Sequence, residues 1–176
     1  IYLNLCYRCG SKIIEEARKF VPTIEAHEST GKGEIREGSI AELKEGDIVV
    51  SRITAPLVSL CLFLIRNKIS ATVLGRNIGK NLIAAINDTK KVRINDIIQV
   101  LYKKRDSLVE RLLQSGKADS LEDALENSLV VQQYEIIQTI EAIAANSDAK
   151  TAKGLIGEIN RIFSDEKASI TLMTVH

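Results

Sequence analysis

The sequence predicts an α/β fold in which a parallel sheet with flanking helices is interrupted by an all-helical insertion. Three observations support this prediction. Apolar segments typical of strands lie at both ends of the chain, at residues 1–6 and 169–175. A strand, a helix and a second strand follow one another over residues 47–74, with short joints between them. Between residues 77 and 164 the apolar residues recur only at helical spacing.

The first quarter of the chain predicts a strand, a helix and a region of turns. An amphipathic helix is expected over Lys12–Val21, and Pro22 would end it. Residues 23–46 contain four glycines and read as short strands and turns. Within them, Thr23–His27 and Gly33–Arg36 are expected to pair as a small hairpin.

The clearest unit is the strand–helix–strand segment. Asp47–Ile53 reads as a strand, and Thr54 is a candidate cap for a helix that carries Pro56 in its first turn. The helix should end near Asn67 and lead into a strand at Ser70–Leu74. Because this helix is apolar nearly all round, we expect it to be buried on most sides. Such crossovers are right-handed in about 98% of cases, which predicts a parallel sheet covered by helices.

The helical segment predicts four helices. They are expected near residues 79–86 and 95–114, from Ser120 onward, and near 150–163, with Gly116 as a stop signal. Ser120 and the acidic residues after it resemble a capping box, and the helix that follows has apolar residues at coiled-coil-like spacing. These are Leu129, Ile136, Ile140 and Ile143.

These elements predict two domains. Residues 1–78 and 165–176 would form the α/β core, and residues 79–164 the helical insertion. The chain lacks an initiator Met and starts inside a strand pattern, so we expect it to be part of a longer protein.

Composition narrows the function classes. The net charge is +1, from 24 basic and 23 acidic residues, so overall charge gives no support for nucleic-acid binding. Three cysteines argue against a disulfide framework and fit a cytoplasmic or nuclear protein. The longest apolar run, Pro56–Ile65, is about half the length that a membrane span needs, so no membrane partner is expected.

Two strand ends carry side chains suited to phosphate and base recognition. Tyr7 and Arg8 follow the first strand, and Thr174 and His176 end the last one. Ligands of open α/β sheets bind beyond the carboxyl ends of the strands. A guanidinium can bind two phosphate oxygens at once, and a tyrosine ring can stack on a base. The alternative is structural: a tyrosine at the rim of the core and an arginine in a surface ion pair.

The two ends resemble motifs of the UvrD/Rep class of superfamily 1A DNA helicases. Cys6-Tyr7-Arg8-Cys9 resembles the family's N-Y-R-S, with cysteines in place of Asn and Ser. Leu172-Met173-Thr174-Val175-His176 resembles L-M-T-x-H, and the chain stops before the K-G-L-E that would follow. Asp47–Leu57 resembles the strand I-L-x-R-T-N-A, and Gly75–Lys80 resembles the turn into the accessory domain.

The resemblance implies a second RecA-like motor domain with a reduced accessory domain. Tyr7 would pack on adenine and Arg8 would reach the terminal phosphate of ATP, held with Mg²⁺ mainly by an N-terminal RecA-like domain of the same longer chain. Single-stranded or duplex DNA would be the other partner. Its contacts would come from the basic and hydroxyl residues at the strand ends, namely Arg52, Thr54, Arg76, Thr174 and His176.

Other chemistries find less support. No G-x-x-x-x-G-K-[ST] phosphate loop is present, so this chain alone is not expected to hydrolyse ATP. Cys6 and Cys9 have the spacing of half a zinc site, but no second pair exists and no metal is expected.

Two alternative functions stay open. One is a non-catalytic α/β module whose helices, Leu129–Ile143 especially, dock a protein partner. The other is a helicase–nuclease fusion.

Overall fold

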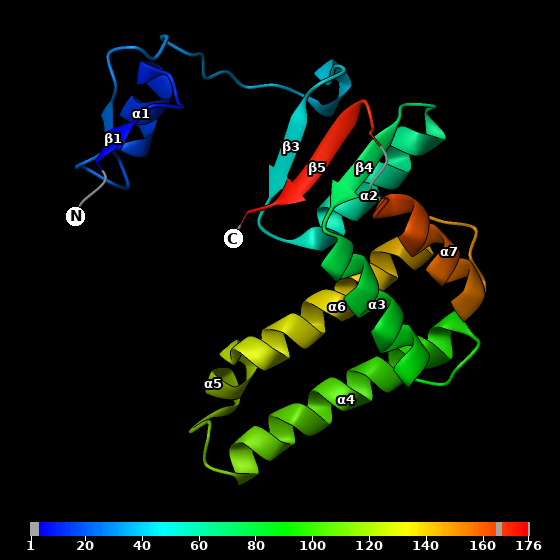
Figure 1. The fold of residues 1–176 in the computed structure, drawn as a ribbon. Helices are drawn as coiled ribbons and strands as arrows, with labels where there is room; N and C mark the ends of the chain where they lie inside the picture. Colours follow the sequence, from blue (N-terminus) through cyan, green and yellow to red (C-terminus); the bar gives the residue numbers. More distant parts are fainter. Residues whose placement is uncertain (1–3, 165–166, 176) are drawn as a thin grey trace. The chain divides into compact units, whose positions relative to one another are not determined.

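The computed structural model describes residues 4–164 and 167–175, which form an α/β protein with seven α-helices and two small parallel sheets. The expected α/β class is therefore confirmed. Contacts between residues divide the chain into two compact units, one of residues 1–43 and one of residues 44–176 (Figure 1).

The first unit is a small two-stranded sheet with one helix. Strand β1 (Leu5–Cys6) pairs in parallel with β2 (Glu25–Ala26), and helix α1 (Ser11–Ala17) connects them. A single 3-10 turn, η1 (Ile40–Glu42), lies near the end of the unit. Helix α1 ends at Ala17, and turns rather than helix lead to Pro22.

The predicted hairpin in this unit is wrong. Residues 33–36 belong to no strand, and the loop before them packs on the start of α1 instead. The amides of Ser11 and Lys12 donate hydrogen bonds to the carbonyls of Gly31 and Lys32, at 3.0 and 2.9 Å. A Cβ on Gly10 would come within 2.6 Å of the Gly33 nitrogen, so this close approach requires glycine.

The second unit is built on a three-stranded parallel sheet. Its strands are β3 (Ile48–Ser51), β4 (Ala71–Leu74) and β5 (Ile170–Thr174), in the order β3-β5-β4. All three were expected as strands. The last strand occupies the centre, so β3 and β4, which are joined by one helix, are not direct neighbours.

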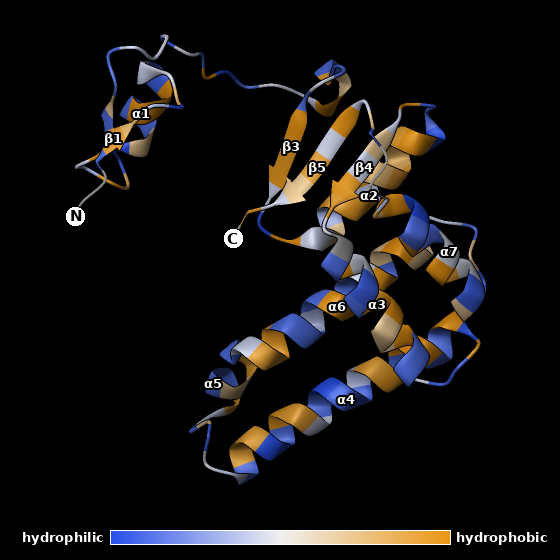
Figure 2. Cartoon of the chain, in the orientation of Figure 1, coloured by the Kyte–Doolittle hydropathy of each residue, from blue (hydrophilic) through white to orange (hydrophobic). Residues whose placement is uncertain are grey.

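Helix α2 (Thr54–Arg66) packs against one face of this sheet. Pro56 is its third residue, where no intrahelical N–H bond is lost. Leu57, Val58 and Cys61 of α2 are buried against the strands, which are mostly apolar (Figure 2). On β3, Ile48 and Val50 are 61% and 49% exposed, so within this unit the described helices leave that face open there. The expectation that helices cover the whole sheet is wrong for this strand.

Five helices connect β4 to β5. They are α3 (Arg76–Asp88), α4 (Ile94–Gln114), α5 (Leu121–Glu126), α6 (Ser128–Ala145) and α7 (Ala152–Ile162). The first begins three residues earlier than expected. The helix expected from Ser120 onward is split into two.

The break between α5 and α6 lies at Asn127. Its backbone is extended, with ψ 131°, and its side-chain oxygen accepts a hydrogen bond from the Leu129 amide at 3.0 Å. Ser120 caps α5 by accepting from the Asp123 amide at 3.1 Å, as its sequence pattern indicated. The starts of α5 and α6 therefore follow from side chains that satisfy a free amide in the first turn of each helix.

Helix α6 is the centre of the helical part. It packs on α2 at one side and runs alongside α4 (Figure 1). Ile137, Ile140 and Ile143 are fully buried by these contacts. The helices therefore share a compact unit with the three-stranded sheet.

Candidate functional site

The carboxyl ends of the three parallel strands of the second unit form one edge of its sheet. Ser51 lies opposite Thr174, and Leu74 lies opposite Met173, so the strands end nearly level with one another. Arg52 comes directly after β3, and Gly75 directly after β4. The register therefore brings the chain segments of four predicted site residues to one edge, which we call the carboxyl edge. They are Arg52, Thr54, Arg76 and Thr174.

Arg52 and Thr54 differ in accessibility. Arg52 lies in the bend between β3 and α2, and it is exposed. Thr54 is the first residue of α2, with Ile53 in the cap position, so the prediction of Thr54 as the cap is wrong by one residue. The Thr54 side chain is 8% exposed and lines a cavity of about 160 Å³ between α2, α3 and α6.

Thr174 lies at the end of the central strand. It is half-buried, and the next residue, Val175, donates its amide to the Ser51 carbonyl at 3.1 Å. This bond fixes the end of β5 beside the end of β3. His176 and the side chain of Arg76 lie outside the described part of the structure.

Tyr7 and Arg8 lie in the first unit, in the bend after β1. Both are exposed, Tyr7 by 66%. The Tyr7 ring stacks on His27, with ring centroids 4.2 Å apart and an angle of 28° between the planes. The Nδ1 atom of His27 in turn lies 2.6 Å from the hydroxyl oxygen of Ser29. Tyr7 therefore already has a π-stacking partner, while Arg8 extends from the same bend toward solvent.

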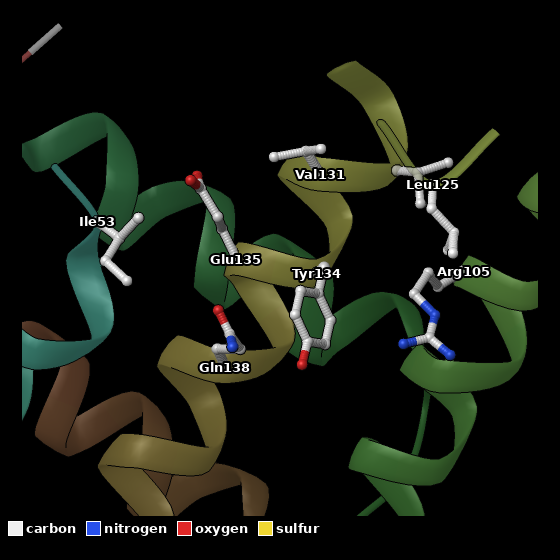
Figure 3. A pocket seen from close by; sticks show the side chains of 8 residues that line it. Ile53, Arg105, Leu125, Val131, Tyr134, Glu135 and Gln138 are labelled. Atoms are coloured by element: carbon white, nitrogen blue, oxygen red, sulfur yellow. The ribbon is translucent and has the colours of Figure 1, made fainter. Parts of the chain in front are cut away.

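A pocket of about 410 Å³ lies close to the carboxyl edge, between Ile53 and helices α4, α5 and α6 (Figure 3). Its lining is mainly apolar and includes side chains that are exposed at its rim. These are Ile53, Leu125, Val131 and Tyr134, which are 38–46% exposed.

A cluster of aromatic and charged groups adjoins this pocket and contributes Arg105 and Tyr134 to its lining. The Arg105 guanidinium lies over the rings of Tyr102 and Tyr134, 5.0 and 5.6 Å from their centroids. The Tyr102 hydroxyl donates to the Glu141 carboxylate, at 3.1 Å from Oε1. Burial, followed by this hydrogen bond, raises the pKa of Tyr102 above its ordinary value.

Two features of these sites were not indicated by the sequence. The stack of His27 on Tyr7 joins the residues that directly follow β2 and β1, two strands whose parallel pairing was not expected. The cluster of Arg105 and Tyr134 joins α4 and α6, which are separated in sequence by a loop and α5. Helical periodicity placed both helices but gave no register between them.

Comparisons with models of protein families, with curated proteins and with solved structures found no match for this chain. Within residues 4–164 and 167–175, no three His, Cys, Asp or Glu side chains gather as a metal site. Over the same residues, no helix has the length and apolar character needed to cross a bilayer.

Proposed function

We propose that this chain is the second RecA-like motor domain of a UvrD/Rep-type ATP-dependent DNA helicase or translocase. In this proposal, single-stranded DNA runs along the carboxyl edge. ATP and Mg²⁺ are held by a preceding RecA-like domain of a longer chain, and Arg8 completes that ATP site when the two domains close. The helical segment takes the place of a reduced accessory domain.

The observation that carries the proposal is the register of the second sheet. Motifs that lie more than a hundred residues apart in sequence, around Arg52 and Thr174, end on neighbouring strands at one edge. A site for an extended polymer needs such a row of donors, because phosphate contacts fix a strand in register. An exposed guanidinium at Arg52 and a hydroxyl at Thr174 supply donors of the required kind.

The positions of Tyr7 and Arg8 support the ATP part of the proposal. A guanidinium that is exposed on a bend after a strand is free to enter a phosphate site on a neighbouring domain. Such an arginine stabilises charge that develops during phosphoryl transfer, which can accelerate hydrolysis by a factor of about 10³ or more. Tyr7 would exchange its contact with His27 for the adenine ring.

Single-stranded DNA binding tests the carboxyl edge. We expect Arg52→Ala to weaken the binding of a labelled oligothymidylate to this chain and to lower the slope of log K against log salt by about 0.7, because one phosphate contact is lost. Fluorescence anisotropy at several salt concentrations measures both quantities.

Arg66 provides the matched control. It is an exposed arginine in the last turn of the same helix, α2, which starts at the carboxyl edge and runs away from it. Arg66→Ala removes the same charge and should leave the slope unchanged. Equal effects of the two substitutions would exclude a specific role of the edge.

A second candidate is a non-catalytic module that docks a protein partner. It is favoured by the 410 Å³ pocket, whose apolar rim residues Leu125, Val131 and Tyr134 are exposed. On this candidate the longer protein shows no DNA-stimulated ATP hydrolysis, and Val131→Asp abolishes partner binding. DNA-stimulated ATP hydrolysis that Val131→Asp lowers would instead assign this pocket to the motor.

A further inference from the structure

Two thiols flank the exposed Tyr7–Arg8 bend. Cys6 ends β1 and Cys9 lies just before α1, and each is partly accessible to solvent. Only Tyr7 and Arg8 separate the two cysteines, and the chain bends at Tyr7, Arg8 and Cys9. The two thiols interact with each other, which shifts the pKa of both. Joining the two sulfurs therefore requires a rearrangement within this bend alone.

The backbone amides of Arg8 and Cys9 lower the pKa of the Cys6 thiol by hydrogen bonding. Donors of this kind stabilise a thiolate, which is the nucleophilic form of cysteine.

The third cysteine has opposite surroundings. Cys61 lies fully buried in α2, and its thiol donates to the Ala71 carbonyl at 3.5 Å. Cys61 meets the same reagents in solution as Cys6 and Cys9, but its burial keeps these reagents away from it in the folded state. Cys61 is thus an internal control for reactivity.

We propose that Cys6 and Cys9 form a reversible dithiol–disulfide site, which exchanges with small disulfides such as oxidised glutathione. The Cys6 thiolate attacks one glutathione sulfur, forms a mixed disulfide and releases one glutathione thiolate, which takes up a proton. Cys9, as thiolate, then attacks the Cys6 sulfur and releases the second glutathione. The two cysteines are oxidised by two electrons, and one oxidised glutathione becomes two reduced ones.

The order of the two attacks follows from the local donors. Backbone hydrogen bonds from Arg8 and Cys9 lower the pKa of the Cys6 thiol, whereas its hydrogen bond with Cys6 raises the pKa of Cys9. Cys6 is therefore the first nucleophile and Cys9 the resolving thiol. The resulting ring would contain Tyr7 and Arg8, but the thiol chemistry is independent of the proposed motor function.

Peptide mapping tests the proposal directly. The chain is equilibrated with mixtures of reduced and oxidised glutathione, quenched with acid and alkylated, and then digested with trypsin without reduction. Because trypsin cleaves after Arg8, a Cys6–Cys9 disulfide leaves peptide 1–8 linked to peptide 9–12. We expect this linked pair to accumulate as the glutathione becomes more oxidised, and to disappear with dithiothreitol.

Two variants and the internal control complete the test. Cys9→Ser should trap a glutathione adduct on Cys6, and Cys6→Ser should give less adduct on Cys9. Cys61 should stay unmodified under all these conditions. Recovery of Cys6 and Cys9 as free thiols at every glutathione ratio, or a persistent Cys6 adduct in the unaltered chain, would overturn the proposal.

Discussion

Tyr7 has a large exposed ring that makes few contacts with its surroundings. It is 66% exposed, and its main aromatic contact is the stack on His27. A ring in this position can leave its neighbour for a nucleotide base at small cost. The sequence motif pointed to Tyr7 and Arg8 through residue types alone. It did not indicate the stack on His27, because that contact depends on the pairing of β1 with β2.

Replacement of Tyr7 should affect ATP affinity more than catalysis. We expect Tyr7→Ala in the longer protein to raise the Michaelis constant for ATP about tenfold, because a base–aromatic stack contributes about 1–3 kcal/mol. Tyr7→Phe keeps the ring and should stay near the original value. Steady-state kinetics measure both, and an unchanged constant for Tyr7→Ala would exclude base stacking.

Cys61 makes a prediction about alkaline stability. Burial raises the pKa of the Cys61 thiol to about 11, from an ordinary value of 9.0. Between these pH values the unfolded thiol loses its proton while the folded one keeps it. The stabilising contribution is therefore complete below pH 9 and is lost between pH 9 and about pH 11, by up to about 1.4 kcal/mol per pH unit.

The comparison of the unaltered chain with Cys61→Ala isolates this contribution. The alanine variant should be less stable at pH 7 because it loses buried packing. The gap between the two should narrow by about 1.4 kcal/mol per pH unit in the alkaline range. Urea unfolding under reducing conditions measures the free energy of unfolding of both proteins. A difference between them that stays constant from pH 7 to pH 10 would contradict the assigned burial of the thiol.

Among the elements, those with a strong local pattern were predicted correctly, and those set by distant contacts were not. Strand β3, helix α2 and strand β4 were expected within a few residues of their observed bounds. The hairpin of residues 23–27 and 33–36 was wrong, because β2 pairs with β1 instead. Short strands have too few residues for an alternating pattern to choose their partner.

The junction of α7 with β4 gives a prediction at the scale of elements. The Thr72 hydroxyl, which is buried, donates to the carbonyls of Ile162 and Ser164, at 3.2 and 3.0 Å. These carbonyls lie at the carboxyl end of α7, where the helix provides no partner of its own. We expect Thr72→Val to lower the free energy of unfolding by about 1–3 kcal/mol, because valine keeps the shape but leaves the carbonyls without a donor.

Thr171 is the control for this substitution. It lies directly opposite Thr72 on β5 and is half-buried. Thr171→Val is the same chemical change and should alter stability by less than about 0.5 kcal/mol. Denaturant unfolding compares the two variants, and equal losses would show that the hydroxyl of Thr72 does not hold the end of α7.

For the whole molecule, the amino-acid sequence predicted the fold class and the order of elements along the chain better than the arrangement of these elements in space. The central position of β5 joins residues 170–174 to strands that lie about a hundred residues earlier. No local pattern encodes such a pairing. The boundary between the two units, at residues 43 and 44, falls inside the segment that the sequence predicts as a single α/β core. The core and insertion boundaries of the RecA-like assignment stay predictions.

The role of Arg8 as the arginine that completes an ATP site on a neighbouring domain is the central claim. It is tested by DNA-stimulated ATP hydrolysis of the longer protein with Arg8→Ala, with Arg36→Ala as control. Arg36 is an exposed arginine of the same unit, and it pairs with Glu42 at 3.2 Å. We predict that Arg8→Ala lowers turnover by a factor of about 10³ or more with ATP binding retained, while Arg36→Ala has no effect. Turnover of Arg8→Ala equal to that of Arg36→Ala would contradict the claim.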